Sequence, residues 1–301
     1  DAAPEGRHLA ALRQSGISRC GALDVPALRI ANLLVGNDAN DAALEITLGQ
    51  CEIEFTQPGW FALTGAGCDA TLDGGAVWTG WRLPVKAGQR LTLSLPRRGM
   101  RSYLAVAGGL DVPEVMGSRS TDLKAGIGGL EGRLLKAGDR LGVRPSSRHF
   151  REARGVKQML FGNRLRTLPG PEYHEFSPQA QAMLWRTPWH LSPDSNRMGY
   201  RLQGQRLERT TDREMLSHGL LPGVIQVPHN GQPIILMNDA QTTGGYPRIA
   251  FVIEADLWHL AQIRPGEPIH FMQCTHEQAL AARADHQRFF EQLAWRLNDA
   301  D

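Results

Sequence analysis

Glycine and proline recur along the whole of this chain and limit the length of any regular element. The 301 residues include 33 glycines and 18 prolines, about a sixth of the chain against about 12% in average proteins. Glycine weakens helices and strands through its backbone freedom, and proline interrupts both. This composition excludes an all-helical bundle and favours short strands joined by turns.

Alternating and apolar runs locate the strands of the first half. Residues 51–55 (CEIEF) and 91–95 (LTLSL) alternate apolar with polar side chains, whereas 60–63 (WFAL) and 103–106 (YLAV) are short apolar runs. The first pattern is typical of half-buried strands and the second of fully buried ones. Such short strands predict a small barrel or sandwich.

The second half also has short strands joined by turns. Further strands are expected at 156–161, 224–227, 234–237 and 249–253, with Asn230-Gly231 as a hairpin turn. The glycine-dense residues 107–142 are followed by a polar, basic stretch from 144 to 154. We therefore predict two domains, 1–143 and 144–301.

Three helices are predicted from capping and spacing. One begins after the N-cap residue Asp24 and ends at Gly36, and a second begins at Ser177-Pro178 and ends before Pro188. A C-terminal helix starts near His276, with Phe289, Leu293 and Leu297 on one face.

Charge, cysteine and hydropathy patterns narrow the class of protein. The 33 Lys and Arg against 31 Asp and Glu give a net charge of +2, which argues against nucleic-acid binding. Cys20, Cys51, Cys68 and Cys274 form no C-x-x-C pair, so we expect free thiols and a cytoplasmic location. The sequence holds no apolar stretch approaching the ~20 residues of a membrane span.

The usual motifs of nucleotide-binding, zinc and serine enzymes are absent. The sequence contains no G-x-x-x-x-G-K-[ST], H-E-x-x-H or G-x-S-x-G, and its ten histidines are scattered. No metal site is expected.

A glycine-rich segment is the first candidate site. Residues 117–123 (GSRSTDL) and 126–132 (GIGGLEG) combine glycines with hydroxyl and charged side chains. Backbone N–H groups and an arginine suit a carboxylate or phosphate, while turn formation alone would use the same residues. The candidate substrate- or phosphate-binding residues are Ser118, Arg119, Thr121, Asp122, Gly128 and Gly129.

A strand end supplies the second candidate. The sequence NDAQTTGGYP at 238–247 follows the expected strand 234–237, where a rigid scaffold can present reactive groups. A tight turn with an Asx-type Asp239 is the structural alternative. The candidate catalytic residues are Asp239, Gln241 and Thr243, with Thr242 and Tyr246 as binding residues.

For two weaker candidates we favour structural roles. Residues 197–201 (RMGYR) suit a carboxylate ligand or an exposed strand edge, and we favour the edge. Cys20 has no base nearby in the sequence, so a buried, inert thiol is expected.

Several segments taken together resemble the biotin-dependent carboxyltransferase family, also called the KipA or allophanate hydrolase subunit 2 family. These segments are 30–37 (IANLLVGN), 43–47 (ALEIT), 117–122, 128–132 and 241–247. Three others resemble the 5-oxoprolinase branch of this family: 15–18 (SGIS), 170–176 (GPEYHEF) and 226–233 (QVPHNGQP). The sequence around Gly6-Arg7-His8 departs from the family pattern.

The resemblance implies a mainly β fold of two cyclophilin-like β-barrel lobes with a few short helices. It implies a subunit of an ATP-dependent 5-oxoprolinase that hydrolyses 5-oxo-L-proline to L-glutamate. The expected partners are subunits A and B, of the LamB/YcsF-like and KipI-like types. ATP, held by this chain or by a partner, would act with Mg²⁺.

The resemblance also suggests roles for the candidate residues. Asp239 would orient or deprotonate the attacking water, the residues from Gln241 to Thr243 would hold the lactam amide, and Arg119 with its neighbours would bind carboxylate or phosphate. Two alternatives stay open: a biotin-dependent carboxyltransferase half of the urea carboxylase type, and a non-catalytic partner of the KipI-like subunit. The chain has no Met-Lys-Met biotin attachment sequence.

Overall fold

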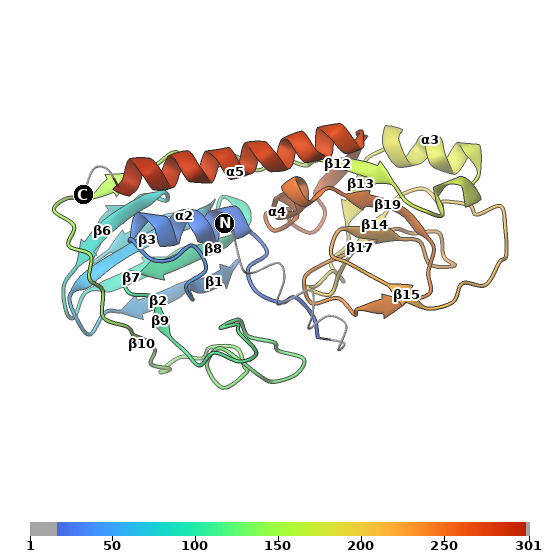
Figure 1. The fold of residues 1–301 in the computed structure, drawn as a ribbon. Coiled ribbons are helices and arrows are strands. Elements are labelled where there is room, and N and C mark those ends of the chain that lie inside the picture. Colours follow the sequence, from blue (N-terminus) through green and yellow to red (C-terminus); the bar gives the residue numbers. More distant parts are fainter. Residues whose placement is uncertain (1–16, 299–301) are drawn as a thin grey trace. The chain divides into compact units, whose positions relative to one another are not determined.

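The computed structural model describes residues 17–298, which form two compact units (Figure 1). Unit 1 comprises residues 17–23 and 162–286, and unit 2 comprises 24–161 and 287–298. Strands make up 31% and helices 18%, so the mainly β fold is confirmed. The domain limits 1–143 and 144–301 stay a prediction, and Arg7 lies outside the described residues.

A closed barrel of seven strands forms unit 1. Neighbouring strands are antiparallel, except that β12 and β20 pair in parallel and close the ring. The barrel removes the free strand edges that an open sheet would expose. In spatial order the strands are β12 (Arg164–Pro169), β19 (Arg248–Val252), β16 (Val224–Gln226), β17 (Ile234–Leu236), β14 (Gly199–Gln203), β13 (Trp189–Leu191) and β20 (Pro268–Gln273).

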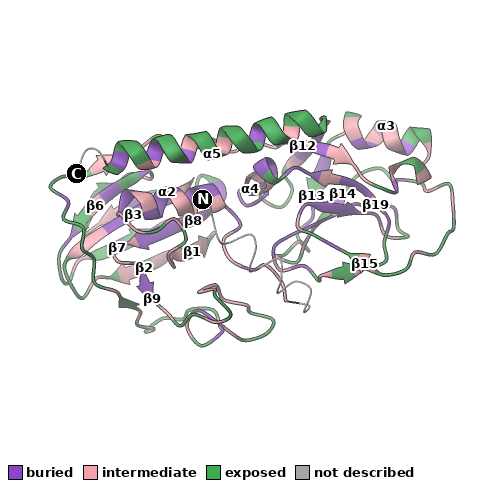
Figure 2. Cartoon of the chain, in the orientation of Figure 1, coloured by how far each residue is buried: buried purple, intermediate pink, exposed green. Residues whose placement is uncertain are grey.

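The interior of this barrel is apolar. Trp189, Tyr200 and Ile235 are almost fully buried there, and Figure 2 shows buried residues concentrated along the barrel strands. The hairpin of β16 and β17 confirms the predicted Asn230-Gly231 turn, since Gly231 takes a φ of +75°.

Short elements complete unit 1. Helix α3 (Pro178–Arg186) is capped by Ser177, whose Oγ accepts a hydrogen bond from Ala180 N, and it ends before Pro188 as predicted. The chain before Pro188 is extended because proline disfavours a helical residue in front of it. The others are η1 (Tyr173–Glu175), β15 (His218–Gly219), β18 (Thr243–Gly244), η2 (Glu254–Asp256) and α4 (Leu257–Leu260).

Unit 2 is built from two open sheets rather than a second closed barrel among the described strands. A five-stranded sheet contains β1 (Leu44–Thr47), β8 (Arg98–Val106), β3 (Gly59–Gly67), β6 (Trp81–Val85) and β11 (Arg154–Gly155). A four-stranded sheet contains β2 (Cys51–Glu54), β7 (Arg90–Leu93), β4 (Ala70–Leu72) and β5 (Gly75–Val77). The short strands β9 (Leu110–Asp111) and β10 (Gly142–Val143) pair separately.

Alternate side chains of strand β3 belong to two different apolar clusters. Phe61 and Leu63 belong to one cluster with residues of the four-stranded sheet. Ala62 belongs to the other, with side chains of α2 (Val25–Leu34) and α5 (His276–Asn298). Because alanine is small, the helix can approach the sheet closely, and Thr64 Oγ1 donates a hydrogen bond to Ala27 O at 2.7 Å.

The predicted helix ends are confirmed. Asp24 accepts a hydrogen bond from Ala27 N at 2.9 Å, and Gly36 follows α2 with a φ of +68°. In α5, Leu293 and Leu297 are buried in the helix-side cluster of unit 2, as their spacing indicated.

The strand predicted at residues 156–161 is wrong. Strand β11 ends at Gly155, after which Val156 N donates a single bond to Gly80 O and the Gln158 side chain accepts from Gly65 N at 2.7 Å. A side-chain bond therefore replaces the backbone ladder that a strand would need.

Candidate functional site

Asp239 lies directly after β17 and is held by Arg197. Arg197 Nε donates to Asp239 Oδ2 at 2.9 Å, and Arg197 Nη2 donates to Oδ1 at 3.1 Å. The Asp239 side chain is 14% exposed. Both carboxylate oxygens are thus engaged in a bidentate pair, the strongest form of side-chain ion pair. The exposed strand edge favoured for residues 197–201 is wrong, because β14 pairs with both β17 and β13 in the closed barrel. Arg197 binds a carboxylate, but one of this chain.

Residues 18–22 are hydrogen-bonded to the chain just after β17. Asn238 Nδ2 donates to the carbonyl oxygens of Cys20 and Ala22 at 3.2 and 3.0 Å, and Cys20 N donates to Asn238 O at 3.1 Å. Arg197 Nη2 also donates to Gly21 O at 2.5 Å. The ion pair therefore belongs to a structural junction as well as to the candidate site.

The segment after Asp239 presents its side chains outward. Gln241, Thr243 and Tyr246 are exposed, while Thr242 O accepts a bond from Leu220 N at 2.8 Å. Thr243 and Gly244 form β18, which pairs with β15. These side chains are therefore open to a ligand, and their backbone is fixed.

An ion pair with a buried carboxylate, and a histidine near it, were not predicted. The Glu172 carboxylate accepts from Arg248 Nε and Nη2, each at 2.9 Å. Burial alone would raise the Glu172 pKa, but the hydrogen bonds from Arg248 and the nearby His218 bring it below its ordinary value. His218 Nε2 is buried with no hydrogen-bond partner. Glu172 lies in segment 170–176, which carried part of the family resemblance, but neither Glu172 nor His218 was marked as a candidate residue.

In the glycine-rich segment, Asp122 forms an Asx-type turn. Its Oδ1 accepts from Lys124 N and Ala125 N, each at 3.0 Å, and Asp122 N donates to Ile127 O. One carboxylate oxygen of Asp122 is therefore already hydrogen-bonded within the loop.

The other polar residues of this loop are also partly engaged. Ser118 Oγ accepts from Ser120 N at 3.1 Å. Arg119 pairs with Glu114 at 3.3 Å, and its side chain is 30% exposed. Since surface pairs of this kind contribute little, Arg119 can exchange Glu114 for an anionic ligand.

Close packing explains why glycines stand at 128 and 129. Their φ angles are +74° and +51°. A Cβ on Gly128 would lie 2.0 Å from Ser120 O, and one on Gly129 would lie 1.9 Å from Thr121 Oγ1. Larger side chains are excluded by contacts within the loop itself.

The two candidate segments belong to different units. The glycine-rich loop is in unit 2 and the segment from Asp239 to Tyr246 is in unit 1. The roles of both sets of residues stay predictions.

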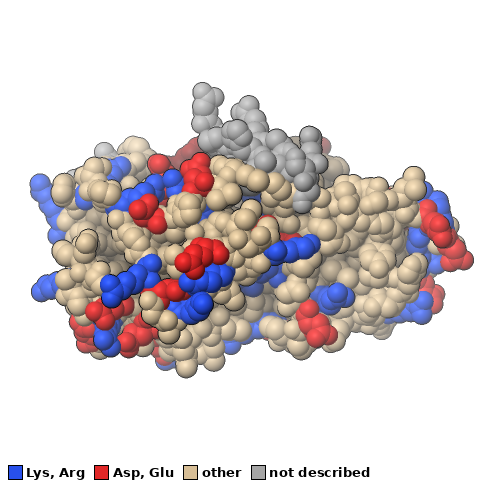
Figure 3. Space-filling model, turned by 90° about the horizontal axis from the view of Figure 1, so that it is seen from below, with Lys and Arg blue, Asp and Glu red and all other residues tan. Residues whose placement is uncertain are grey.

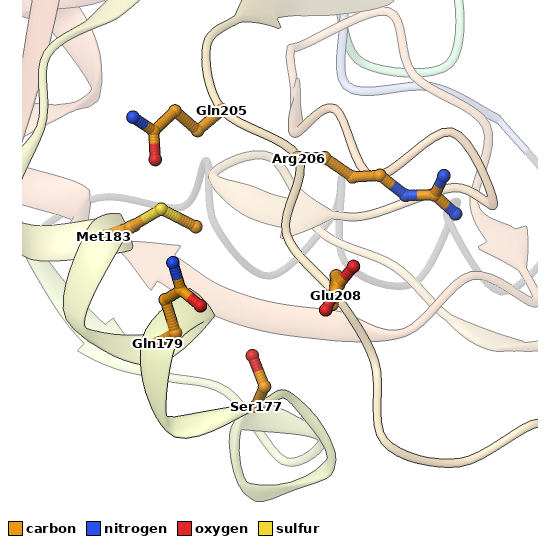
Figure 4. A pocket seen from close by; sticks show the side chains of 6 residues that line it. All are labelled: Ser177, Gln179, Met183, Gln205, Arg206 and Glu208. Carbon is orange, nitrogen blue, oxygen red and sulfur yellow. The ribbon is translucent and has the colours of Figure 1, made fainter.

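A cavity of ≈ 200 Å³ lies beside α3 in unit 1 (Figure 4). In Figure 4 the Arg206 guanidinium points away from Gln179 and Met183. No motif or pattern in the sequence indicated this cavity. Its lining residues are Ser177, Gln179, Met183, Gln205, Arg206 and Glu208.

Charged side chains of both signs share the surface. Figure 3 shows Lys and Arg interspersed with Asp and Glu on the face it presents. Among residues 17–298, no three His, Cys, Asp or Glu side chains are grouped as a metal site, so no carboxylate set fitting Mg²⁺ is seen there. Within the same range, no helix is both long and apolar enough to span a bilayer.

Comparison with known proteins shows extensive similarity. Residues 15–273 match the carboxyltransferase domain, subdomain A and B. The chain is 75% identical to the C subunit of the 5-oxoprolinase of Escherichia coli K12, covering 98% of this chain and 94% of that protein. Identity to the corresponding 5-oxoprolinase subunit of Haemophilus influenzae is 46%, covering 94% and 91%.

A solved structure shares the fold. The crystal structure of Kluyveromyces lactis urea amidolyase superposes with a TM-score of 0.86 at 27% identity. The match covers 92% of this chain but only 18% of that chain. From these matches we conclude that the chain belongs to the carboxyltransferase domain family, as a relative of the 5-oxoprolinase subunits of Escherichia coli and Haemophilus influenzae.

Proposed function

We propose that this chain is a subunit of an ATP-dependent 5-oxoprolinase. The overall reaction is 5-oxo-L-proline, ATP and two water molecules giving L-glutamate, ADP and phosphate. The observation that carries the proposal is the 75% identity to the Escherichia coli subunit over 98% of this chain and 94% of that one. The partners would be subunits A and B, of the LamB/YcsF-like and KipI-like types, in the cytoplasm.

The chemistry explains why ATP is needed. Opening an unstrained five-membered lactam is unfavourable, so coupling to phosphoryl transfer supplies the driving force. Phosphorylation of the amide oxygen would make the carbonyl carbon electrophilic toward water. The substrate and this phosphorylated species are both anions, and donors fixed in advance stabilise such charge.

We assign a role to the candidate residues of each segment. Gln241, Thr242 and Thr243 would hold the lactam amide, with Tyr246 beside them. Ser118, Arg119 and Thr121, on the loop shaped by Asp122, Gly128 and Gly129, would bind carboxylate or phosphate. Asp239 would orient the attacking water.

Replacing Asp239 by asparagine tests its role in the assembled complex. The D239N variant should lower 5-oxoproline-dependent ATP turnover by about 100-fold, the effect of losing a group that acts on the attacking water. Unchanged turnover in a complex that still assembles would remove this role.

Reconstitution with each subunit omitted in turn tests the function itself. ATP hydrolysis is followed with and without 5-oxoproline, together with glutamate release. We expect substrate-dependent turnover only when all three subunits are present. ATP binding, with Mg²⁺ present, measured on each subunit alone identifies the subunit that holds ATP. Full activity of the two partner subunits without this chain would instead support a non-catalytic partner.

A carboxyl-transfer assay tests the remaining alternative, a biotin-dependent carboxyltransferase half of the urea carboxylase type. The complex is incubated with carboxybiotin and urea, and carboxylated urea is measured. The family membership makes this control necessary. Carboxyl transfer without 5-oxoproline-dependent turnover would contradict the proposed function.

A further inference from the structure

His218 carries a buried nitrogen atom that nothing in its surroundings uses. Among residues 17–298, His218 Nε2, Arg144 Nε and Trp258 Nε1 are buried side-chain atoms without a hydrogen-bond partner. The arginine and tryptophan nitrogens always carry a hydrogen, whereas an imidazole nitrogen can gain or lose one. His218 is therefore the member of this group that can transfer a proton.

The hydrogen bond on the other side of the ring assigns the tautomer. His218 Nδ1 lies 3.1 Å from Leu216 O. A carbonyl oxygen only accepts hydrogen bonds, so Nδ1 carries the hydrogen and donates it. In the neutral ring Nε2 then carries no hydrogen. Its lone pair can accept a proton, as a general base requires.

The fold places His218 across from the segment that presents the candidate substrate ligands. On β15, His218 pairs with Gly244 and Gly219 pairs with Thr243 of β18. A Cβ on Gly244 would lie 2.8 Å from Leu220 Cδ1 and 3.4 Å from Gln226 Nε2, so the strand lies close over the barrel. Each of these strands has only two residues, and such a short ribbon can open locally at low cost.

An ion pair lies near His218, and the other candidate base is already occupied. The Glu172 carboxylate, paired with Arg248, lies within electrostatic range of His218. Asp239 is less suited to accept a proton, because both its oxygens already accept hydrogen bonds from Arg197.

We propose that His218 is the general base of the hydrolysis described under "Proposed function", an inference that rests on that function. Nε2 takes a proton from water as the water oxygen forms a bond to the lactam carbonyl carbon. The same proton is returned to the lactam nitrogen as the carbon–nitrogen bond breaks. The ring ends this step neutral. The acyl phosphate left on the opened chain, whose phosphoryl group came from ATP, is hydrolysed by the second water molecule to L-glutamate and phosphate.

Two variants in the assembled complex separate proton transfer from structure. His218→Asn keeps an amide N–H that can replace Nδ1–H toward Leu216 O, but it removes the basic nitrogen. His218→Ala leaves space for free imidazole. His190→Asn, at an exposed histidine of β13, is the matched control, and unfolding midpoints check that each variant is folded.

The expected result is a loss of at least about 100-fold in kcat for H218N, with KM within about threefold. H190N should match the wild type, and added imidazole should restore part of the turnover of H218A. An H218N variant with near-normal kcat, or a folded H218A variant that imidazole does not rescue, overturns the proposal. A wild-type complex without 5-oxoproline-dependent turnover would instead defeat the proposed function.

Discussion

The pair of Glu172 and Arg248 shows how a single residue can depend on a distant partner. Their side chains are 7% and 21% exposed, and two parallel hydrogen bonds join them. Removing one member of such a pair leaves a poorly hydrated charge without compensation, which costs about 3 kcal/mol. The pair should therefore contribute measurably to folding at neutral pH.

This contribution should depend on pH in a defined direction. The Glu172 pKa is below its ordinary value of 4.5 in the folded protein, so its stabilisation is present above about pH 4.5 and is lost as the pH falls through the folded value. In urea unfolding, Glu172→Gln should be about 3 kcal/mol less stable than wild type at pH 7, and the difference should shrink near pH 3. The exposed Glu208→Gln is the control. An equal difference at both pH values would contradict this account.

Single residues were predictable where their partners are near in sequence. Asp24 and Ser177 were expected as caps because the N–H group that each accepts from lies only three residues ahead. Arg197 and Asp239 are 42 residues apart, and only the folded barrel brings them together. Local composition marked Asp239 as a candidate, but it cannot reveal an ion pair of this kind.

At the scale of elements, the glycine-rich loop offers a matched test of packing. Gly126 and Gly128 have similar φ angles of +67° and +74°. A Cβ added to Gly126 would meet nothing within 4 Å, whereas one added to Gly128 would meet Ser120 O at 2.0 Å. Gly126→Ala should cost only the backbone strain of about 1 kcal/mol, and Gly128→Ala should distort the loop.

Hydrogen exchange measures this difference at one amide. Asp122 N donates to Ile127 O within the loop, so G128A should accelerate its exchange by at least about tenfold relative to G126A, which corresponds to about 1.4 kcal/mol. Equal exchange rates in the two variants would show that the loop accommodates a side chain at 128.

Other elements show where pattern reading succeeds and fails. The strands with clear alternation or apolar runs were found, as at β2 and β16. The segment 156–161 has the composition of a strand, but Gln158 bonds Gly65 through its side chain. Periodicity reports which residues are buried, not which backbone groups are paired.

For the whole molecule, the sequence predicted two mainly β parts and a long C-terminal helix. The family resemblance implied two barrel lobes; one part closes as a seven-stranded barrel, whereas the described strands of the other form two open sheets. Closure depends on the parallel pairing of β12 with β20, a contact between residues far apart along the chain. Such long-range pairing is decided by the summed packing of each core rather than by local patterns.

Helix α5 contributes to the core of unit 2, because its residues after 286 pack in that core. Leu293 is 9% exposed in that core, whereas Leu280 of the same helix is 66% exposed. Both Leu→Ala changes favour the helix equally, so their difference isolates burial. Leu293→Ala should lower the free energy of unfolding by about 2–4 kcal/mol, and Leu280→Ala should change it by less than about 0.5 kcal/mol. Urea unfolding followed by circular dichroism checks both, and similar losses for the two variants would mean that α5 does not contribute to the core of unit 2 as described.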